Sequence, residues 1–494
     1  MEADGGTGRI TRTLTPTARR ILFQRNLEEQ IDTDLPLIAR IDTAHLLMLM
    51  RRKIIDRQIG VRLLRAVNRL VDQQFDPLKS GISIRGAYLL YESYLIETEG
   101  EAVGGVLQTG RSRNDLNATL LRLRLREPYR LLMRSALRLQ ALMLRRAEMY
   151  AGTVMPAYTH GQAAEPITYG HYLAGVAAAI QRDIDGLLEA AREIDTSPLG
   201  ACAGAGSSLP IDPAMTADLL GFARTSPNSI DAVASRDMVL RLLAGMAVCG
   251  VTLSRIATDL LQWLTEEFRF LTLPDEMVGS SSAMPQKRNP FLLEHVQGRT
   301  ASALGAFTAA LAASRNVSFS NSISVGTESV RPVWGAFQDL ENAANLLRLV
   351  IGYARPCPER MLYRTNTSFI NATAFAVQLV LERGIDFRSA HHAVGRAVTE
   401  AVGRGMSSLE ELGAANAQSL DPSSESMNFE DMDPVSCVRR AQYGGGPAPE
   451  CINAHLKTLR ACWSERRRRI QGQTGYWAAA CNKLEASVSS VCGR

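Results

Sequence analysis

Lysine is scarce in this chain of 494 residues. Lys and Arg together number 55, yet only five are lysine, and Lys287 is the only one between positions 79 and 457. The two cations are not interchangeable where a small anion must be met by a compact point charge. The isolation of Lys287 fits such a position, and chance placement is the plainer alternative.

Several sequence features that would indicate other protein classes are missing. The eight cysteines include no C-x-x-C pair and no metal-ligand spacing, and we find no glycine-rich nucleotide-binding loop. The basic N-terminal residues are not followed by a sustained apolar run, and no window of about 18 apolar residues stands out. We therefore expect a reduced, cytoplasmic protein with no metal, no cofactor and no membrane span.

Strong charge of one sign is also missing. The formal net charge is +5, which is small for this length and lacks the clustered basic signature of a nucleic-acid binder. The run at 466–469, four consecutive arginines, is the exception. We interpret it as the solvated face of a C-terminal helix, with nucleic-acid or membrane contact as the minor alternative.

Long apolar segments with helical spacing dominate what is present. They cover 238–270, about 166–194 and about 290–315, and the first alone would span roughly 50 Å as a helix. Their apolar surface is hard to cover within one subunit, so we expect a helix bundle completed by oligomerisation. No run of alternating strands competes, and the fold class is predicted to be all-α. Domain boundaries are expected near 108 and 354, giving domains 1–108, 109–353 and 354–494.

The most informative segment is the loop at 279–290, which reads Gly-Ser-Ser-Ser-Ala-Met-Pro-Gln-Lys-Arg-Asn-Pro. It offers three hydroxyls, the Lys287 cation and the Asn289 amide between two helical segments. These groups suit removal of a proton from a carbon beside a carboxylate and stabilisation of the resulting charge. A serine-rich surface loop is the plainer alternative, but it leaves the Met-Pro-x-Lys-x-Asn-Pro run unexplained.

Two further polar blocks interrupt the helical pattern. At 109–115 the chain reads Thr-Gly-Arg-Ser-Arg-Asn-Asp, whose two guanidiniums, hydroxyl and amide suit a carboxylate or phosphate. A helix N-cap made by Asn114 or Asp115 is the structural alternative. The second block carries Thr159 and His160, expected at the start of a long helix, where a partly buried structural histidine is the competing interpretation. Glu294 could orient His160 and set its tautomer.

Taken together, these blocks resemble the fumarase/aspartase superfamily, and within it the argininosuccinate lyase branch. The family signature Gly-Ser-x-x-Met-x-x-Lys-x-Asn corresponds to 280–289, and Thr-Gly-Arg-Ser-Arg-Asn-Asp is intact at 109–115. The Pro-Gly-Tyr-Thr-His-x-Gln pattern corresponds to 156–162, and 228–237 is similar to the fourth block of the branch. The order and spacing of the four blocks match over about 180 residues.

The resemblance implies three helical domains and a homotetramer built on a bundle of about twenty helices, with each active site shared by three subunits. It also implies anti β-elimination from a succinyl-bearing dicarboxylate, with release of fumarate through a carbanion. By position, Ser281 would be the base and His160, supported by Glu294, would pass a proton to the leaving group. The remaining residues implied to bind substrate are Lys287, Asn289, Ser112, Arg113, Asn114, Thr159, Arg236 and Ser282.

The sequence departs from the family at several positions. The usual Gly is Ser280, so Ser280 and Ser282 compete with Ser281 as the base, and Gln108 and Leu116 replace the usual His and Gln. Segment 319–328 reads Phe-Ser-Asn-Ser-Ile-Ser-Val-Gly-Thr-Glu, where argininosuccinate lyases carry Tyr-Asn-x-Asp-Leu-Gln-Glu-Asp-Lys. The elimination chemistry is retained and the contacts to the amine half are not.

We therefore predict a carbon–nitrogen lyase that acts on an N-substituted aspartate or related nitrogen-bearing succinate. Argininosuccinate lyase itself is the alternative, followed by adenylosuccinate lyase, which shares the serine loop but not the 109–115 block. A carboxymuconate-type cycloisomerase uses the same scaffold. A crystallin-like structural protein is disfavoured because every residue of the implied chemistry is present.

Overall fold

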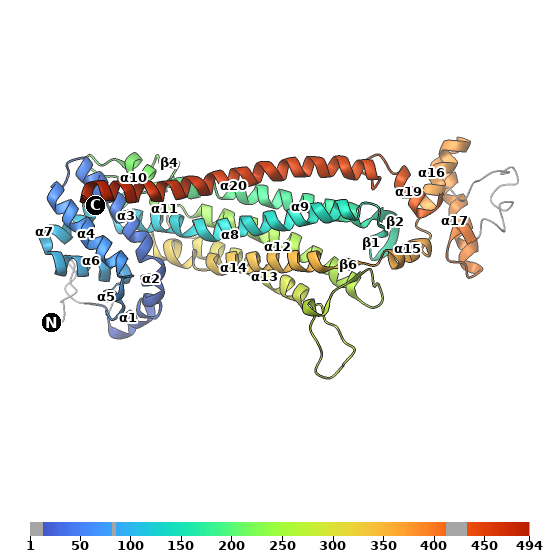
Figure 1. Cartoon of the computed structure of the whole chain (residues 1–494), viewed down its shortest axis with the longest axis horizontal. Helices are drawn as coiled ribbons and strands as arrows, with labels where there is room; N and C mark the ends of the chain where they lie inside the picture. Colours follow the sequence, from blue (N-terminus) through green and yellow to red (C-terminus); the bar gives the residue numbers. More distant parts are fainter. Residues whose placement is uncertain (1–12, 82–84, 412–431, 494) are drawn as a thin grey trace.

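The chain forms an elongated, almost entirely helical molecule, with short helices at both ends of a long bundle (Figure 1). The computed structural model describes residues 13–81, 85–411 and 432–493. The predicted all-α class is confirmed, with one addition: six short strands pair into three two-stranded sheets. The strands are β1 (Val154–Thr159), β2 (Gln162–Thr168), β3 (Thr196–Ser197), β4 (Arg224–Thr225), β5 (Leu271–Thr272) and β6 (Arg355–Pro356).

Five long helices make the bundle. They are α8 (Arg113–Met149), α9 (Tyr169–Ala190), α12 (Asp237–Leu264), α13 (Phe291–Ser314) and α14 (Val333–Tyr353). The three helices predicted from apolar spacing are confirmed as α9, α12 and α13. Helix α12 ends at Leu264, short of the expected position 270, because the chain turns back there and the Phe270 amide bonds to the Trp263 carbonyl.

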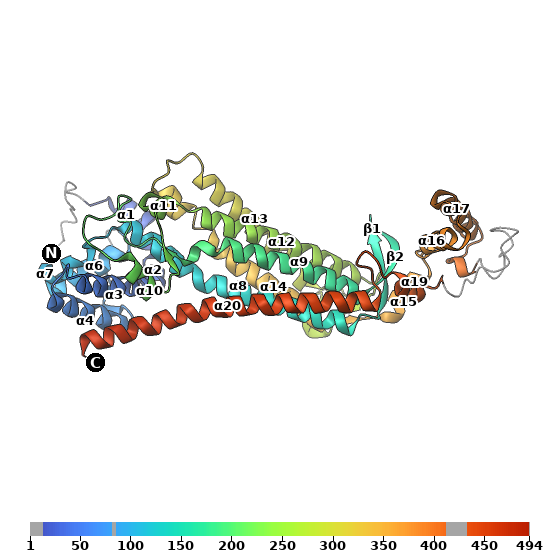
Figure 2. The same ribbon diagram turned by 90° about the horizontal axis from the view of Figure 1, so that it is seen from above.

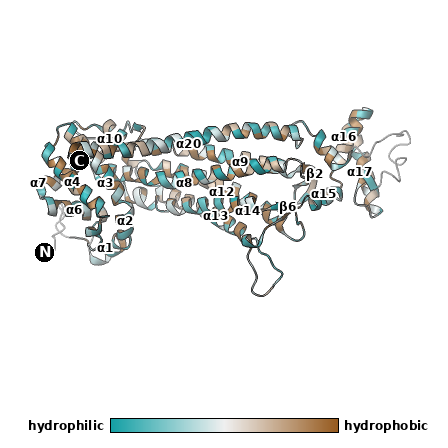
Figure 3. Cartoon of the chain, viewed as in Figure 1, coloured by the Kyte–Doolittle hydropathy of each residue, from teal (hydrophilic) through white to brown (hydrophobic). Residues whose placement is uncertain are grey.

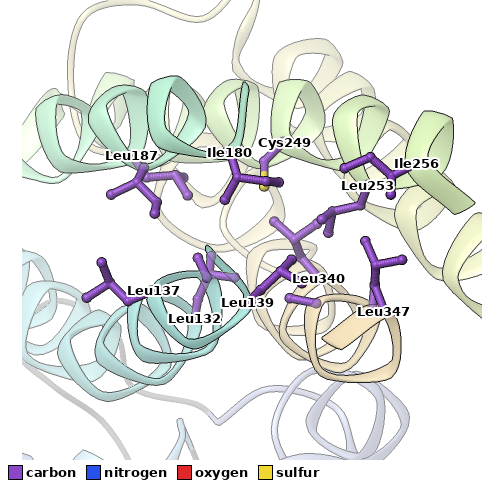
Figure 4. Packing of buried hydrophobic residues seen from close by; sticks show 14 of the residues in the cluster. Leu132, Leu137, Leu139, Ile180, Leu187, Cys249, Leu253, Ile256, Leu340 and Leu347 are labelled. Atoms are coloured by element: carbon purple, nitrogen blue, oxygen red, sulfur yellow. The ribbon is translucent and has the colours of Figure 1, made fainter. Parts of the chain in front are cut away.

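The bundle core consists mainly of aliphatic side chains, with several aromatic ones, and all five helices contribute to it. Figure 4 shows Leu132 of α8, Leu187 of α9 and Leu253 of α12 directed into the same interior, with Leu340 of α14 beside them. Each such buried leucine contributes about 1.5–3 kcal/mol through removal of apolar surface from water. This repeated burial holds the bundle together.

Helix α12 is long and apolar enough to cross a membrane by length and composition. A single helix that passes this test is weak evidence for a membrane span. Half of its most apolar window is buried inside this chain, where α12 packs against α9, α13 and α14. A core helix of a bundle shows the same composition, because it is covered on more than one side.

Short helices form a second core at the N-terminal end, around Ile31, Leu63 and Tyr91. They are α1 (Pro16–Leu22), η1 (Gln24–Asn26), α2 (Leu27–Thr33), α3 (Leu35–Arg51), α4 (Arg57–Asp72), α5 (Asp76–Lys79), α6 (Ala87–Glu99), α7 (Glu101–Gly104) and η2 (Gly105–Gln108). Between α9 and α14 lie η3 (Arg192–Asp195), α10 (Pro213–Leu219), α11 (Ser229–Ala234), η4 (Asp275–Met277) and the π-helical turn η5 (Ser324–Glu328).

The last helix, α20 (Pro449–Cys492), runs back along the whole bundle to the N-terminal helices in both views (Figures 1 and 2). Teal and brown residues alternate along α20 in Figure 3, as expected for a helix with one covered face. Trp463 donates to the Leu137 carbonyl at 2.9 Å, and Arg466 forms a bidentate pair with Asp185 at 2.6 Å. Arg466, the first arginine of the 466–469 run, therefore links α20 to α9.

The far end of the molecule has a small core of its own, built around Phe375, Ala390 and Met432. Its helices are α15 (Pro358–Asn366), α16 (Ala372–Arg383), α17 (Phe387–Gly403) and α19 (Pro434–Arg440). Segment 354–494 was expected to form one C-terminal domain. In the structure its last 44-residue helix joins the bundle instead, because α20 contributes Ile452, Leu456 and Leu459 to the bundle core.

Candidate active site

The block at 109–115 forms the start of α8. Ser112 is the N-cap residue: its Oγ accepts from the Asn114 amide at 3.3 Å, while the Ser112 amide donates to Asp115 Oδ1 at 2.9 Å. The other oxygen of Asp115 accepts from the amides of Gly200 and Cys202 at 3.0 and 2.9 Å. The capping interpretation was thus correct in kind but wrong in residue, because Ser112 caps the helix and Asp115 completes the box.

Only one of the two guanidiniums in this block is available to a substrate. Arg111 is buried, and its Nη1 lies 2.5 Å from Oδ1 of Asp42, whose side chain is also fully buried. The idea that both arginines meet an anion is therefore wrong for Arg111. Arg113 is exposed, with no hydrogen bond or ion pair to the residues that the structure describes.

Asn114 meets the segment that departs from the family pattern. The side-chain amide of Asn321 donates to Oδ1 of Asn114 at 2.8 Å. A Cβ placed on Gly326 would come within 3.2 Å of Asn321 Oδ1, so the glycine leaves room for that side chain. The contact brings 319–328 against the N-terminus of α8, more than 200 positions away in sequence.

Arg236 lies beneath the contact between the N-terminus of α8 and segment 319–328 rather than at its surface. It is only 5% exposed, and its Nη1 donates to the carbonyls of Val233 and Ser235 at 3.1 and 2.7 Å. Burial, followed by the nearby charge of Arg122, lowers the pKa of Arg236 to about 10. This geometry therefore does not offer the predicted direct contact between Arg236 and the substrate. It suits Arg236 to holding the backbone at Val233 and Ser235 in place instead.

Thr159 and His160 sit at the tip of a β-hairpin. Strands β1 and β2 pair in antiparallel register with Thr159 opposite Gln162, so His160 and Gly161 form the two-residue turn. Both turn residues have positive φ, 54° and 73°, which is typical of a type I′ turn. The predicted position at a helix start was wrong, because α9 begins only at Tyr169.

The hairpin is held against the bundle end by aromatic contacts. Tyr158 packs on Phe268 and Phe270, with ring centroids 5.5 and 6.3 Å apart. These phenylalanines lie in the segment that follows the end of α12 at Leu264. Thr159 and His160 remain exposed beyond this anchor, free to meet a ligand.

The serine loop extends away from the bundle (Figure 1) and is closed at its base by Gly279 and Asn289, which exchange backbone hydrogen bonds at 2.8 and 2.9 Å. Arg288 fixes that base by donating to the Leu273 carbonyl at 2.8 Å and pairing with Asp275. The loop tip is exposed, so its polar side chains face outward.

Ser281 differs from the two serines beside it. Its Oγ accepts from the amides of Ala283 and Met284 at 3.4 and 3.1 Å, and its side chain is half-buried. Backbone N–H groups aimed at a hydroxyl oxygen favour its deprotonated form. In the part of the chain that the structure describes, no hydrogen bond reaches the Ser280 or Ser282 side chain.

Lys287, Asn289 and Glu294 share this region without touching Ser281 or His160. Lys287 and Glu294 are exposed, and Asn289 is half-buried at the loop base. Among the described residues, no hydrogen bond or ion pair joins Glu294 to His160 or Lys287 to Ser281. The predicted partnership of Glu294 with His160 therefore does not form within one chain.

One chain does not bring the blocks together. Ser112 stands at the start of α8, and the hairpin carrying His160 follows its end, so the 37 residues of α8 separate them by about 55 Å. Figures 1 and 2 show the hairpin and the N-terminal helices at opposite ends of the bundle. A reaction using both blocks requires more than one copy of the chain.

Sequence reasoning missed Asn321, and it named Asp115 as a possible N-cap rather than as the capping-box partner of Ser112. Asp115 had a local signal, because Ser-x-x-Asp before an apolar run is a capping pattern. Asn321 had none, since only the tertiary fold places it beside Asn114. No group of three or more His, Cys, Asp or Glu side chains that could hold a metal occurs within the described ranges.

The chain resembles proteins of known class over most of its length. Residues 53–305 match the lyase family, and 369–439 match the argininosuccinate lyase C-terminal family. An argininosuccinate lyase of Methanoculleus marisnigri is 37% identical over 426 residues, which cover 85% of this chain and 86% of that protein. Argininosuccinate lyase 1 of Shouchella clausii is 30% identical over 471 residues, 94% of each chain.

Among solved structures, EDDS lyase in complex with formate superposes with a TM-score of 0.85 at 27% identity, covering 99% of this chain and 98% of that one. Together, the family match, the relatives and this fold show that the chain is a lyase of the fumarase/aspartase superfamily. Within that superfamily the chain belongs to the argininosuccinate lyase-like branch. It is a carbon–nitrogen lyase of the fumarate-releasing type.

Proposed function

We propose that the enzyme cleaves the carbon–nitrogen bond of an N-substituted aspartate whose amine differs from that of argininosuccinate. The observation that carries the proposal is segment 319–328. It has no lysine or arginine, and the side chains of Phe319 and Ile323 are exposed beside Asn321. Its one charged residue, Glu328, pairs with Arg331 at 3.3 Å. A segment without a cation suits an amine substituent that lacks a carboxylate of its own.

In this proposal Ser281 removes a proton from Cβ of the succinyl half. The electron pair passes into the adjacent carboxylate as an aci-carboxylate, which the Lys287 ammonium and Asn289 amide stabilise. The carbon–nitrogen bond then breaks as the double bond of fumarate forms, and His160, oriented by Glu294, donates a proton to the departing nitrogen. The two amides on Ser281 support its role as the base.

Binding of the substrate carboxylates is assigned to groups from both ends of the bundle. Thr159 at the hairpin tip and Ser112, Arg113 and Asn114 at the start of α8 offer hydroxyl, guanidinium and amide donors to an anion. Ser282 follows the base in the loop and is proposed as a further donor to the same substrate. No metal or cofactor takes part in these steps.

We also propose that the enzyme is a homotetramer whose sites combine residues of different subunits. The length of α8 supports this, since it separates the Ser112 and His160 blocks. Apolar side chains left exposed on the bundle support it too, namely Val248 and Val251 of α12 and Leu304 and Leu311 of α13.

Argininosuccinate lyase is the second candidate function, favoured by identities of 37% and 30% to proteins of that name. The deciding experiment follows fumarate by its ultraviolet absorbance with argininosuccinate, a panel of N-substituted aspartates and nitrosuccinate. Rapid turnover of argininosuccinate would establish the second candidate. Fumarate from another succinyl amine alone would establish the first, and silence on every substrate would favour a cycloisomerase or a structural protein.

A further inference from the structure

The contact between Asn321 and Asn114 crosses between two parts of the proposed site. Asn114 belongs to the block assigned to a substrate carboxylate, whereas Asn321 belongs to the segment assigned to the amine. The Asn321 Nδ2 to Asn114 Oδ1 distance is 2.8 Å, and no covalent or helical neighbour forces the two together.

Which end of Asn114 faces a ligand matters chemically. An asparagine side chain carries one acceptor oxygen and one NH₂ group with two donors, and a carboxylate only accepts. When Asn321 donates to Oδ1, the NH₂ group of Asn114 is turned away from Asn321. Its protein partner on that side is the Ala203 carbonyl, at the long distance of 3.5 Å. The NH₂ group therefore remains available to an anion.

The position of Asn321 is itself defined by the turn that follows. Gly326 lies in η5, and a Cβ there would approach Asn321 Oδ1 to 3.2 Å, closer than most side chains allow. The absence of a side chain at Gly326 lets Asn321 lie against the turn. The preceding residue, Ser320, makes a different contact: its Oγ lies 3.1 Å from the Oγ of Ser318.

We propose that Asn321 is a positioning residue that fixes the amide of Asn114 with its NH₂ group toward the substrate carboxylate. This inference rests on the proposed function and deepens it. Segment 319–328 then acts on the carboxylate half as well as on the amine half, so that changes to the segment alter dicarboxylate binding.

The test uses the full-length enzyme and measures fumarate binding by titration calorimetry, together with kcat and KM for the best substrate. Asn321→Ala removes the donor and is expected to weaken fumarate binding about tenfold. Asn321→Asp can only accept, so it turns the Asn114 amide around and adds a negative charge. Its loss is expected to be larger, about a hundredfold, with KM raised more than kcat is lowered.

Two controls isolate the orientation effect. Ser320→Asp adds the same charge without reaching Asn114 and is expected to weaken binding less than threefold, by screening at an exposed site. Gly326→Ala is expected to displace Asn321 and weaken binding, while Gly335→Ala in α14, whose Cβ would meet nothing within 4 Å, is expected to bind as the wild type does. Unchanged thermal midpoints would show that all variants fold.

The proposal is overturned if Asn321→Asp binds fumarate as tightly as the wild type, or if Ser320→Asp weakens binding equally. Failure of the proposed function is distinguishable. A wild-type enzyme that binds fumarate but releases none from any succinyl amine would refute the lyase assignment and leave Asn321 testable by binding. A wild-type enzyme that binds neither fumarate nor succinate would refute both.

Discussion

Arg111 and Asp42 form an ion pair of 2.5 Å in which both side chains are fully buried. The pair joins the N-terminal helix α3 to the residue directly before the N-cap of α8. Two positions further on, Arg113 has the same charge and is exposed. The two arginines of one motif thus have separable roles, the first in folding and the second facing solvent at the proposed site.

Arg111→Ala is expected to destabilise the protein by about 3–5 kcal/mol, because it leaves the Asp42 carboxylate buried without its partner. Thermal unfolding checks this. Arg113→Ala is the matched control, expected to change stability by less than about 0.5 kcal/mol while raising KM. Equal stability losses in the two variants would contradict the separation of roles.

Ser281→Ala is expected to lower kcat for fumarate release by about a hundredfold or more, because it removes the proposed base. Ser280→Ala and Ser282→Ala test the competing serines, and Ser280→Ala should retain most of the activity. All three positions lie in an exposed loop, so unfolding midpoints should not move. If Ser280→Ala proved the inactive variant, the loop register assumed here would be wrong by one residue.

Mixed assemblies test whether sites are shared. Ser281→Ala and His160→Ala are each expected to be inactive alone. Subunits of the two variants, unfolded and refolded together in equal amounts, should recover about a quarter of wild-type activity, because half of the copies supply each intact group independently. Separately refolded variants mixed afterwards provide the control. No recovery in co-refolded samples would mean that both groups act from one chain.

His45 makes stability depend on pH. Burial, followed by the neighbouring charge of Arg111, lowers its pKa to about 3, and its Nε2 donates to the Thr109 carbonyl at 2.8 Å. The unfolded chain binds this proton near pH 6.5 and the folded chain does not. Stability from this group is therefore full above about pH 6.5 and falls by about 1.4 kcal/mol per unit as pH drops toward 3.

The thermal midpoint measured between pH 4 and pH 7 checks this expectation against His45→Gln. Glutamine keeps an N–H donor for Thr109 but has no titration in the range. The variant should lose stability less steeply than the wild type on acidification. Parallel curves for the two proteins would show that another group controls the acid dependence.

Much of the fold could be predicted because its signals are local. The helical period of apolar residues located α9, α12 and α13 to within a few residues, since an amphipathic or buried helix repeats its pattern along the chain. The hairpin at 154–168 was missed. Its turn depends on positive φ at His160, a conformation that the pattern of apolar residues does not predict.

For the candidate site, too, the sequence predicted some features and only the fold decided others. Residue types led to the proposed chemistry, since hydroxyls, one isolated lysine and an asparagine in a single loop suit proton abstraction and charge stabilisation. The sequence could not separate Arg111 from Arg113, because burial against Asp42 depends on a helix some 70 positions earlier. Motif spacing selected Ser281 but left Ser280 and Ser282 as competitors, because the sequence does not show which oxygen meets the loop amides.

The sequence by itself determined the all-α class and the superfamily, and it supplied the set of candidate reactive groups, because periodicity and motif spacing are properties of the chain. Only the tertiary structure decided which of those groups are buried, which are exposed and how far apart they lie. It also placed α20 along the bundle and Asn321 against Asn114. These outcomes depend on contacts between segments distant in sequence, where packing and burial select one arrangement from many.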